Sequence, residues 1–266
     1  ADTDDDGDGI IDEDDSAPLD STIGDTLAAV FSAIDEVTVE ATGITTVVEL
    51  TLPEVNDNNL NAPTLASDND VALVLGSHEI TWTATDFAGN VATAIQIVHI
   101  VDTTAPKFLE LTLQTIDARG LLTNIVNDID IFANDLVDGD IFAVIVGDTS
   151  YASGEHTLEL TVQDKTGNTA TTEVVVHIKP MVELGQNSQV EAGAPYTALV
   201  ALSGKAAIYP ITIGYQLLGA VSSNNSGELI INNNDNAFIE FNIAETVQAG
   251  DLISITLTSV TNAVLM

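Results

Sequence analysis

The fold of this chain is decided by two matching stretches, GSHEITWTATDFAGNVATAIQIVHI at residues 76–100 and GEHTLELTVQDKTGNTATTEVVVHI at residues 154–178. They align without a gap at a constant offset of 78 in the numbering, and the same offset pairs the dipeptide Asn-Asp at 56–57 with Asn-Asp at 134–135. Chance does not easily keep one register over such a span. We therefore predict two tandem domains, because a fixed repeat period indicates repeated structural units.

Each copy has the pattern of β-strands. In the first copy Ile80, Trp82 and Ala84 alternate with threonines, which is the two-residue period of a strand. The segments DFAGN at 86–90 and DKTGN at 164–168 separate two such runs, and Gly and Asn accept the positive φ of hairpin turns. Short strands with regular turns predict an all-β fold of tandem immunoglobulin-like β-sandwiches. The stretch TLAAVFSAI, residues 26–34, fits either a short helix or the start of the first strand.

The composition excludes several classes of function. The 266 residues include 41 Asp and Glu but only 5 Lys and Arg, so the formal net charge is −36. Such a charge argues against nucleic acid and anionic membrane surfaces as partners. Hydrophobic residues make up 45%, which indicates a folded chain. The absence of cysteine excludes disulfides, thiolate zinc sites and thiol catalysis, and no apolar run is long enough to span a bilayer.

The N-terminal segment 1–25 holds 11 of the 41 acidic side chains and no basic one. One interpretation is a solvated acidic tail, because the segment is too poor in apolar residues for a core. The spacing favours a calcium loop, since acids stand at positions 1, 3, 5, 9 and 12 counted from residue 4, with glycine at position 6. The residue at position 7 of such a loop binds calcium through its backbone carbonyl oxygen. The predicted calcium ligands are Asp4, Asp6, Asp8, Ile10, Asp12 and Asp15.

Two families are suggested by the residues of the N-terminal half. Residues 2–20, DTDDDGDGIIDEDDSAPLD, resemble a thrombospondin type 3 repeat, in which a run of Asp wraps calcium ions with almost no core. Residues 35–106 resemble a hyalin repeat (HYR) domain through VTVEATG at 37–43, GSHEITWTATD at 76–86 and VDTTAP at 101–106. These resemblances imply extracellular, calcium-dependent structure built from immunoglobulin-like sandwiches.

The C-terminal half is similar to related families. NDLVDGD at 134–140, with the 164–168 hairpin, is similar to the bacterial immunoglobulin-like relatives of the HYR domain, which implies a secreted bacterial surface protein. Residues 181–266 lack the repeat and resemble a Calx-beta domain without most of its acidic calcium ligands. Residues 252–266 end within what should be a final strand, which predicts a longer parent protein. The predicted domains are 1–25, 26–105, 106–180 and 181–266.

The loops of an immunoglobulin-like sandwich cluster at its two ends, which would bring loop acids together. At one end of the second sandwich we predict a calcium site shared with the incoming linker. Its predicted ligands are Asp102, Asp135, Asp138, Asp140, Asp164 and Asn168. The corresponding end of the first sandwich, facing the N-terminal arm, offers Asp57, Asp86 and Asn90. The alternative is that these residues are ordinary turn formers.

Nothing in the sequence favours catalysis. Catalytic motifs are absent, and the four histidines form repeat-equivalent pairs, which favours a packing or strand-end role. The pairs are His78 with His156 and His99 with His177. Two functions remain open: a non-catalytic, calcium-stiffened spacer or stalk of a secreted bacterial adhesin, surface layer or filament, and a substrate-binding accessory region of a secreted hydrolase. The predicted partners are calcium and either other copies of the chain or a cell-surface or polysaccharide ligand.

Overall fold

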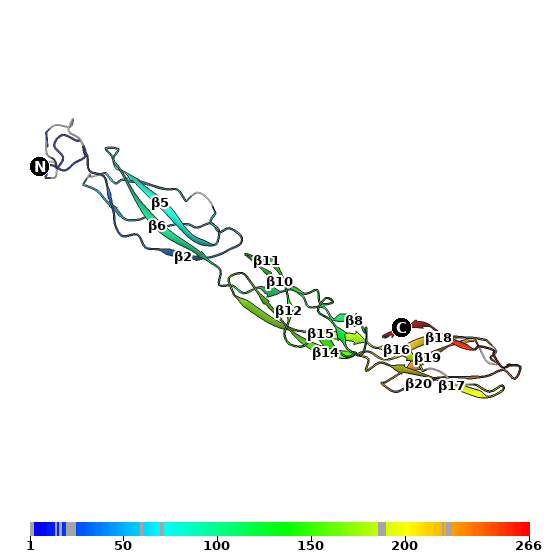
Figure 1. The fold of residues 1–266 in the computed structure, drawn as a ribbon. Coiled ribbons are helices and arrows are strands. Elements are labelled where there is room, and N and C mark those ends of the chain that lie inside the picture. The colour runs from blue at the N-terminus through cyan, green and yellow to red at the C-terminus, as the bar shows by residue number, and fades with distance from the viewer. Residues whose placement is uncertain are drawn as a thin grey trace. The chain divides into compact units, whose positions relative to one another are not determined.

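The computed structural model describes residues 3–13, 15, 18–19, 25–58, 61–69, 72–185, 190–219, 221 and 225–266. The part of the chain that it describes contains 22 strands and no helix, so the predicted all-β fold is confirmed (Figure 1). The chain divides into two compact units. The first unit comprises residues 1–105, 134–139 and 164–168, and the second comprises residues 106–133, 140–163 and 169–266.

The first unit contains the first β-sandwich. Its larger sheet has the strand order β2-β6-β5-β4, in which β2 runs parallel to β6 and the other neighbours are antiparallel. The strands of this sheet are β2 Val37–Glu40, β4 Thr64–Ser67, β5 Gly76–Thr85 and β6 Val91–Val101. A second sheet pairs β1 Val30–Phe31 with β3 Val55–Asn56. The stretch 26–34 therefore leads into a strand instead of forming a helix.

The core of the first sandwich follows the alternation of the β5–β6 hairpin. Ile80, Trp82 and Ala84 are buried, while the threonines between them are only half-buried. Trp82 lies on the inward face as its position in the pattern predicts, and its Nε1 donates to Oε1 of Gln96 at 3.0 Å. Gln96 in turn donates to the backbone oxygen of Asp35 at 3.0 Å. These bonds satisfy the polar atoms that the core encloses.

Strands β7 to β15 form the second sandwich, with sheets of order β12-β14-β15-β8, β11-β10-β7 and β13-β9. Their bounds are β7 Lys107–Phe108, β8 Gln114–Asp117, β9 Thr123–Asn124, β10 Phe132–Asp135, β11 Gly139–Phe142, β12 Val144–Ile145, β13 Ser150–Tyr151, β14 Gly154–Gln163 and β15 Thr169–Lys179. The β14–β15 hairpin pairs Gly154 with Ile178, and the β5–β6 hairpin pairs Gly76 with Ile100. The two hairpins thus share one register, at the offset that the sequence repeat predicts.

A third sandwich follows in the second unit. Its sheets have the orders β20-β17-β16-β22 and β19-β18-β21. The bounds are β16 Met181–Leu184, β17 Pro195–Leu202, β18 Ile211–Leu218, β19 Ser226–Ile231, β20 Ala237–Asn242, β21 Ser254–Val260 and β22 Val264–Leu265. Fully buried Ile211, Ile213, Ile239 and Val200 fill the space between its sheets.

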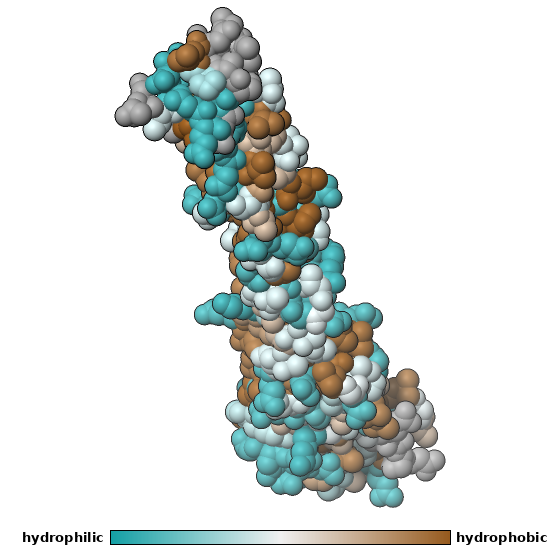
Figure 2. Space-filling view, turned by 90° about the vertical axis from the view of Figure 1, so that its left-hand side faces the viewer, coloured by the Kyte–Doolittle hydropathy of each residue, from teal (hydrophilic) through white to brown (hydrophobic). Residues whose placement is uncertain are grey.

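The histidines lie at strand ends, as their repetition predicts. His78 Nε2 lies 2.7 Å from the backbone oxygen of Val74, and His156 Nε2 lies 2.8 Å from that of Ala152. The second pair differs in its partners, because His99 contacts Glu36 and His177 contacts Glu155. On the face of the molecule drawn in Figure 2, hydrophobic and hydrophilic residues are intermixed. Among the described residues, we find no helix of the length and hydrophobicity that a membrane span needs.

Candidate metal centres

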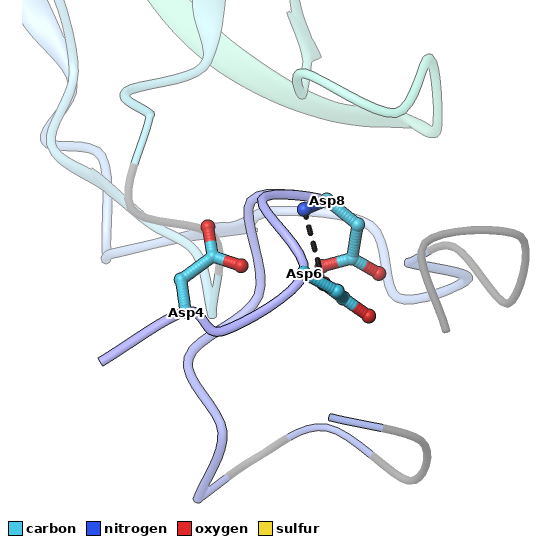
Figure 3. Close-up of side chains that lie close together, drawn as sticks. All are labelled: Asp4, Asp6 and Asp8. Atoms are coloured by element: carbon cyan, nitrogen blue, oxygen red, sulfur yellow. Dashed lines mark hydrogen bonds between the residues drawn. The ribbon is translucent and has the colours of Figure 1, made fainter. Parts of the chain in front are cut away.

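The N-terminal acidic loop folds around its own first carboxylate. Gly7 and Gly9 have positive φ values of 71° and 98°, which only glycine adopts without strain. The backbone N–H groups of Gly7 and Gly9 donate to Asp4 at 2.9 and 3.1 Å, and the N–H of Asp8 donates to Asp6 at 3.2 Å (Figure 3). The glycines at these positions therefore let the chain turn back over Asp4.

This turn brings three of the predicted ligands together. One carboxylate oxygen from each of Asp4, Asp6 and Asp8 lies within 4.8 Å of those of the other two. Oδ2 of Asp6 and Oδ2 of Asp8 are buried and have no hydrogen-bond donor among the described residues. Burial raises the pKa of Asp6, and the charges of Asp8, Asp15 and Asp4 raise it further against a bond from the Asp8 N–H.

The remaining residues of the predicted loop lie outside this compact group of three. Oδ1 of Asp12 accepts the N–H of Asp5 at 2.9 Å, and the N–H of Asp15 donates to the backbone oxygen of Ile11 at 3.0 Å. The side chain of Ile10 is buried. These residues close the loop around the three grouped carboxylates, and the ligand roles of Asp12, Asp15 and the Ile10 carbonyl stay predictions.

A second group joins three distant parts of the sequence. Asp102 follows β6, Asp135 ends β10 and Asp164 follows β14, and one carboxylate oxygen from each lies within 4.8 Å of the others. We call these three residues the Asp102 group. All three are buried, with exposed fractions of 8%, 5% and 6%. Three carboxylates that are kept from water at such short range repel one another strongly.

Hydrogen bonds order the carboxylates of the Asp102 group. Burial acts to raise the pKa of Asp164, but donors from Asn168, Thr166 and Gly167 hold it below its ordinary value. The Thr166 hydroxyl and the backbone N–H groups of Gly167 and Asn168 lie 2.7 to 2.9 Å from Oδ1 of Asp164. The side-chain amide of Asn168 lies 2.8 Å from Oδ2. Burial raises the pKa of Asp102, and the charges of Asp135 and Asp164 add to the rise despite a bond from the Thr104 N–H.

Asn168 holds the linker that carries Asp102. Its Nδ2 donates to the backbone oxygens of Asp102 at 3.1 Å and Thr104 at 3.4 Å, and to Oδ2 of Asp164 at 2.8 Å. Glu40, on β2, holds the same linker from another direction by accepting the Thr103 N–H and the Thr104 hydroxyl, each at 2.8 Å. Hydrogen bonds between protein atoms therefore hold the linker in place without a metal ion.

Two of the predicted acidic ligands lie outside the Asp102 group. Asp138 forms an ion pair with Lys165, whose Nζ lies 2.6 Å from Oδ1 and whose N–H donates to Oδ2 at 2.8 Å. These bonds from Lys165 lower the pKa of Asp138. Asp140 is exposed on β11. The structure thus brings together three of the five acids predicted for this end, and the roles of Asp138 and Asp140 stay predictions.

A third group contains a residue that the sequence analysis missed. One carboxylate oxygen from each of Asp25, Asp57 and Asp86 lies within 4.8 Å of the others. We call these residues the Asp25 group. Asp57 and Asp86 were predicted as ligands, with Asn90, but Asp25 was not. A signal was present: DTLA at 25–28 precedes the first sandwich as DTTA at 102–105 precedes the second, at an offset of 77 instead of 78.

The chemistry of all three groups is that of a hard cation site. Every grouped atom is a carboxylate oxygen, and oxygen-only donor sets favour Ca²⁺ or Mg²⁺ over the transition metals. Calcium–oxygen bonds of about 2.3–2.6 Å place two ligands of one ion at most roughly 5 Å apart, which a group of this compactness satisfies.

Comparison with known proteins gives fold relatives only. No family model and no curated protein matches the chain. Among solved structures it is similar to human CDH23 EC21-23, at 15% identity and a TM-score of 0.36, covering 84% of this chain and 96% of that one. It is also similar to the protocadherin gammaB7 EC3-6 cis-dimer structure, at 13% identity and a TM-score of 0.34, covering 89% and 76%.

A third similar structure is the protocadherin GammaB4 extracellular domain, at 14% identity and a TM-score of 0.31, covering 90% of this chain. The chain spans about half the length of that protein, 49% of it. At these identities and TM-scores the likeness assigns neither a family nor an activity. The resemblances to thrombospondin type 3, HYR and Calx-beta sequences stay predictions.

Proposed function

We propose that this chain is a non-catalytic, adhesive or spacer segment of a secreted bacterial surface protein, in which calcium ions stiffen the linkers between β-sandwiches. The observation that carries the proposal is the Asp102 group. It joins one residue of the linker after β6 to two loops of the following sandwich, and all three side chains are buried. An ion at this place would tie the linker to both loops.

Electrostatics supports an ion there. At an effective dielectric constant of about 20, two unit charges 4.8 Å apart repel by about 3.5 kcal/mol, so three ionised carboxylates oppose their own assembly by about 10 kcal/mol. A divalent cation among them replaces this repulsion with attraction. The hydrogen bonds of Asn168 and Glu40 position the linker. A calcium ion would supply the positive charge that offsets the three carboxylates.

The N-terminal loop fits the same function. Buried carboxylate oxygens of Asp6 and Asp8 without a donor among the described residues are of the kind that calcium coordinates. Extracellular calcium modules bind with dissociation constants of about 10⁻⁴–10⁻³ M. Sites of that affinity would fill outside the cell and respond to the calcium concentration there.

Small-angle X-ray scattering with and without EDTA tests the function. We expect calcium-loaded protein to give the profile of a stiff particle, and EDTA to broaden its distribution of dimensions. The variant Asp102→Asn should give the broad distribution even in calcium. The variant Asp148→Asn, at an exposed position of the second sandwich that is not a predicted ligand, is the matched control and should behave as the wild type. Identical profiles with and without EDTA would contradict the proposal.

A further inference from the structure

We propose that the first sandwich carries a cation site of its own, the Asp25 group, in which Asp25 is the linker ligand and Asn90 is the residue that positions the linker. This site is distinct from the Asp102 group on which the proposed function rests. It would tie the chain that leads into β1 to the loops after β3 and β5, where Asp57 and Asp86 lie.

The burial and hydrogen bonding of the Asp25 carboxylate indicate that it binds a ligand. Asp25 is 8% exposed, and its Oδ1 accepts the Leu27 N–H at 2.8 Å and the Asn58 amide at 3.4 Å. Its Oδ2 is also buried but has no hydrogen-bond donor within the described part of the chain. A buried, unpaired carboxylate oxygen is unfavourable, and here two more carboxylates approach it. A cation would supply the partner that the described residues do not.

The chain builds the same arrangement twice. Nδ2 of Asn90 donates to the backbone oxygens of Asp25 at 3.1 Å and Leu27 at 3.3 Å, and to Oδ2 of Asp86 at 2.8 Å. The three corresponding bonds of Asn168 in the second copy measure 3.1, 3.4 and 2.8 Å. Three closely matching contacts in two copies of different sequence identify the asparagine as the residue that fixes the linker, with its amide nitrogen turned to acceptors.

Residues 1–105 offer no Lys or Arg to balance the carboxylates of the Asp25 group, although they contain 22 Asp and Glu. The second copy has Lys165 in its hairpin, but this residue pairs with Asp138, so it does not balance the Asp102 group either. A bound cation would supply the positive charge that residues 1–105 lack. The donors of the Asp25 group are all oxygens, which selects a hard divalent ion, and Ca²⁺ fits the compactness of the group.

Counting bound calcium by native mass spectrometry at 1 mM CaCl₂ tests the ligand. We expect Asp25→Asn to carry one ion fewer than the wild type, and Asp35→Asn, an exposed neighbour outside the group, to keep the full count. A full count for Asp25→Asn would overturn the inference. Near-ultraviolet circular dichroism of buried Trp82, recorded in EDTA, should be the same for both variants and the wild type, which establishes that the first sandwich is folded.

Isothermal titration with CaCl₂ tests the role of Asn90. A residue that orients ligands without touching the ion typically changes metal affinity 10–100-fold when removed. We expect Asn90→Ala to keep the ion count at saturating calcium and to weaken the first-sandwich site by at least tenfold. Loss of the ion at saturation, or an unchanged affinity, would overturn the positioning role.

The two proposals fail in different ways. If Asp102→Asn loses an ion and Asp25→Asn does not, the Asp25 site is refuted and the proposed function stands. If only Asp25→Asn loses an ion, the first sandwich has its site and the Asp102 group does not. We expect each single variant to lose one ion and the double variant Asp25→Asn/Asp102→Asn to lose two.

Discussion

Replacing Asp102 by Asn should stabilise the calcium-free protein and reduce the stabilisation that calcium gives. In the wild type without calcium, the carboxylate of Asp102 meets those of Asp135 and Asp164 within 4.8 Å. Two such repulsions, at about 3.5 kcal/mol each for a dielectric constant of about 20, cost about 7 kcal/mol. Asparagine removes both repulsions and keeps the shape, so the variant should be the more stable protein in EDTA.

Calcium should reduce the difference in stability between the two proteins. At 10 mM calcium and a dissociation constant of about 10⁻⁴ M, an ion that binds only the folded protein adds about 2.7 kcal/mol to its stability. A gain of 1 kcal/mol raises the Tm of a domain of this size by roughly 4–8 °C, so the wild type should gain roughly 10–20 °C. The variant should lose that share of the gain, since two carboxylates hold the ion less tightly than three.

Differential scanning calorimetry in 10 mM CaCl₂ and in EDTA measures both effects. The difference in Tm between wild type and Asp102→Asn isolates the Asp102 group, because the other carboxylate groups respond to calcium equally in both proteins. Asp148→Asn provides the control for removing one negative charge from an exposed position that is not a predicted ligand. An equal rise in Tm with calcium for both proteins would refute a calcium site at Asp102. A lower Tm of the variant in EDTA would refute the repulsion on which the argument depends.

Further predictions concern single contacts elsewhere. Asp6→Asn should lower the number of bound calcium ions by one in native mass spectrometry, and an unaltered count would place the ion outside the N-terminal loop. Trp82→Phe leaves Oε1 of Gln96 buried without its donor, so urea unfolding should show a loss of about 1–3 kcal/mol; an unchanged midpoint would contradict this. Arg119 lowers the pKa of Asp128 below its ordinary value of 3.8. The ion pair therefore stabilises the fold above pH 3.8, and this stabilisation is lost as the pH falls through the lowered pKa of Asp128. Asp128→Asn should therefore cost about 1 kcal/mol or less at pH 7, because Arg119 is half exposed, and the difference from the wild type should shrink in urea melts below pH 3.8.

The fold was predictable because its signals are local. Alternation over ten residues, followed by a Gly-Asn turn and a second alternating run, specifies a hairpin with little help from the rest of the chain. The repeat then placed the two hairpins in the same register, and burial of Trp82 followed from its parity within the strand. It was also predictable that Asp102, Asp135 and Asp164 lie close together, because sandwich topology brings a linker and two loops to one end of the domain.

The missed features depend on details that local patterns do not encode. An offset of 78 pairs Asp102 with Gly24, so the ungapped repeat hides its true counterpart, Asp25, by one position. The offset is 77 at Asp25 and 78 at Asp57, which shows that the segment between these two positions is one residue longer in the second copy. Whether Asp138 turns to the ion site or to Lys165 depends on the path of its loop, which residue types alone do not determine.

The placement of the acids argues that their function is binding and not solubility. Acids that serve solubility gain by staying exposed, because burial disfavours the charged form of a carboxylate. In each of the first two sandwiches, however, the chain buries an acid of the linker beside acids of two loops, and it uses an asparagine to hold that linker in place. Residues 1–105 hold all of one such group and contain no Lys or Arg to balance it. An arrangement that opposes folding in two copies, at corresponding positions in both, supports the proposal that each group binds a metal cation, whose charge would balance the carboxylates.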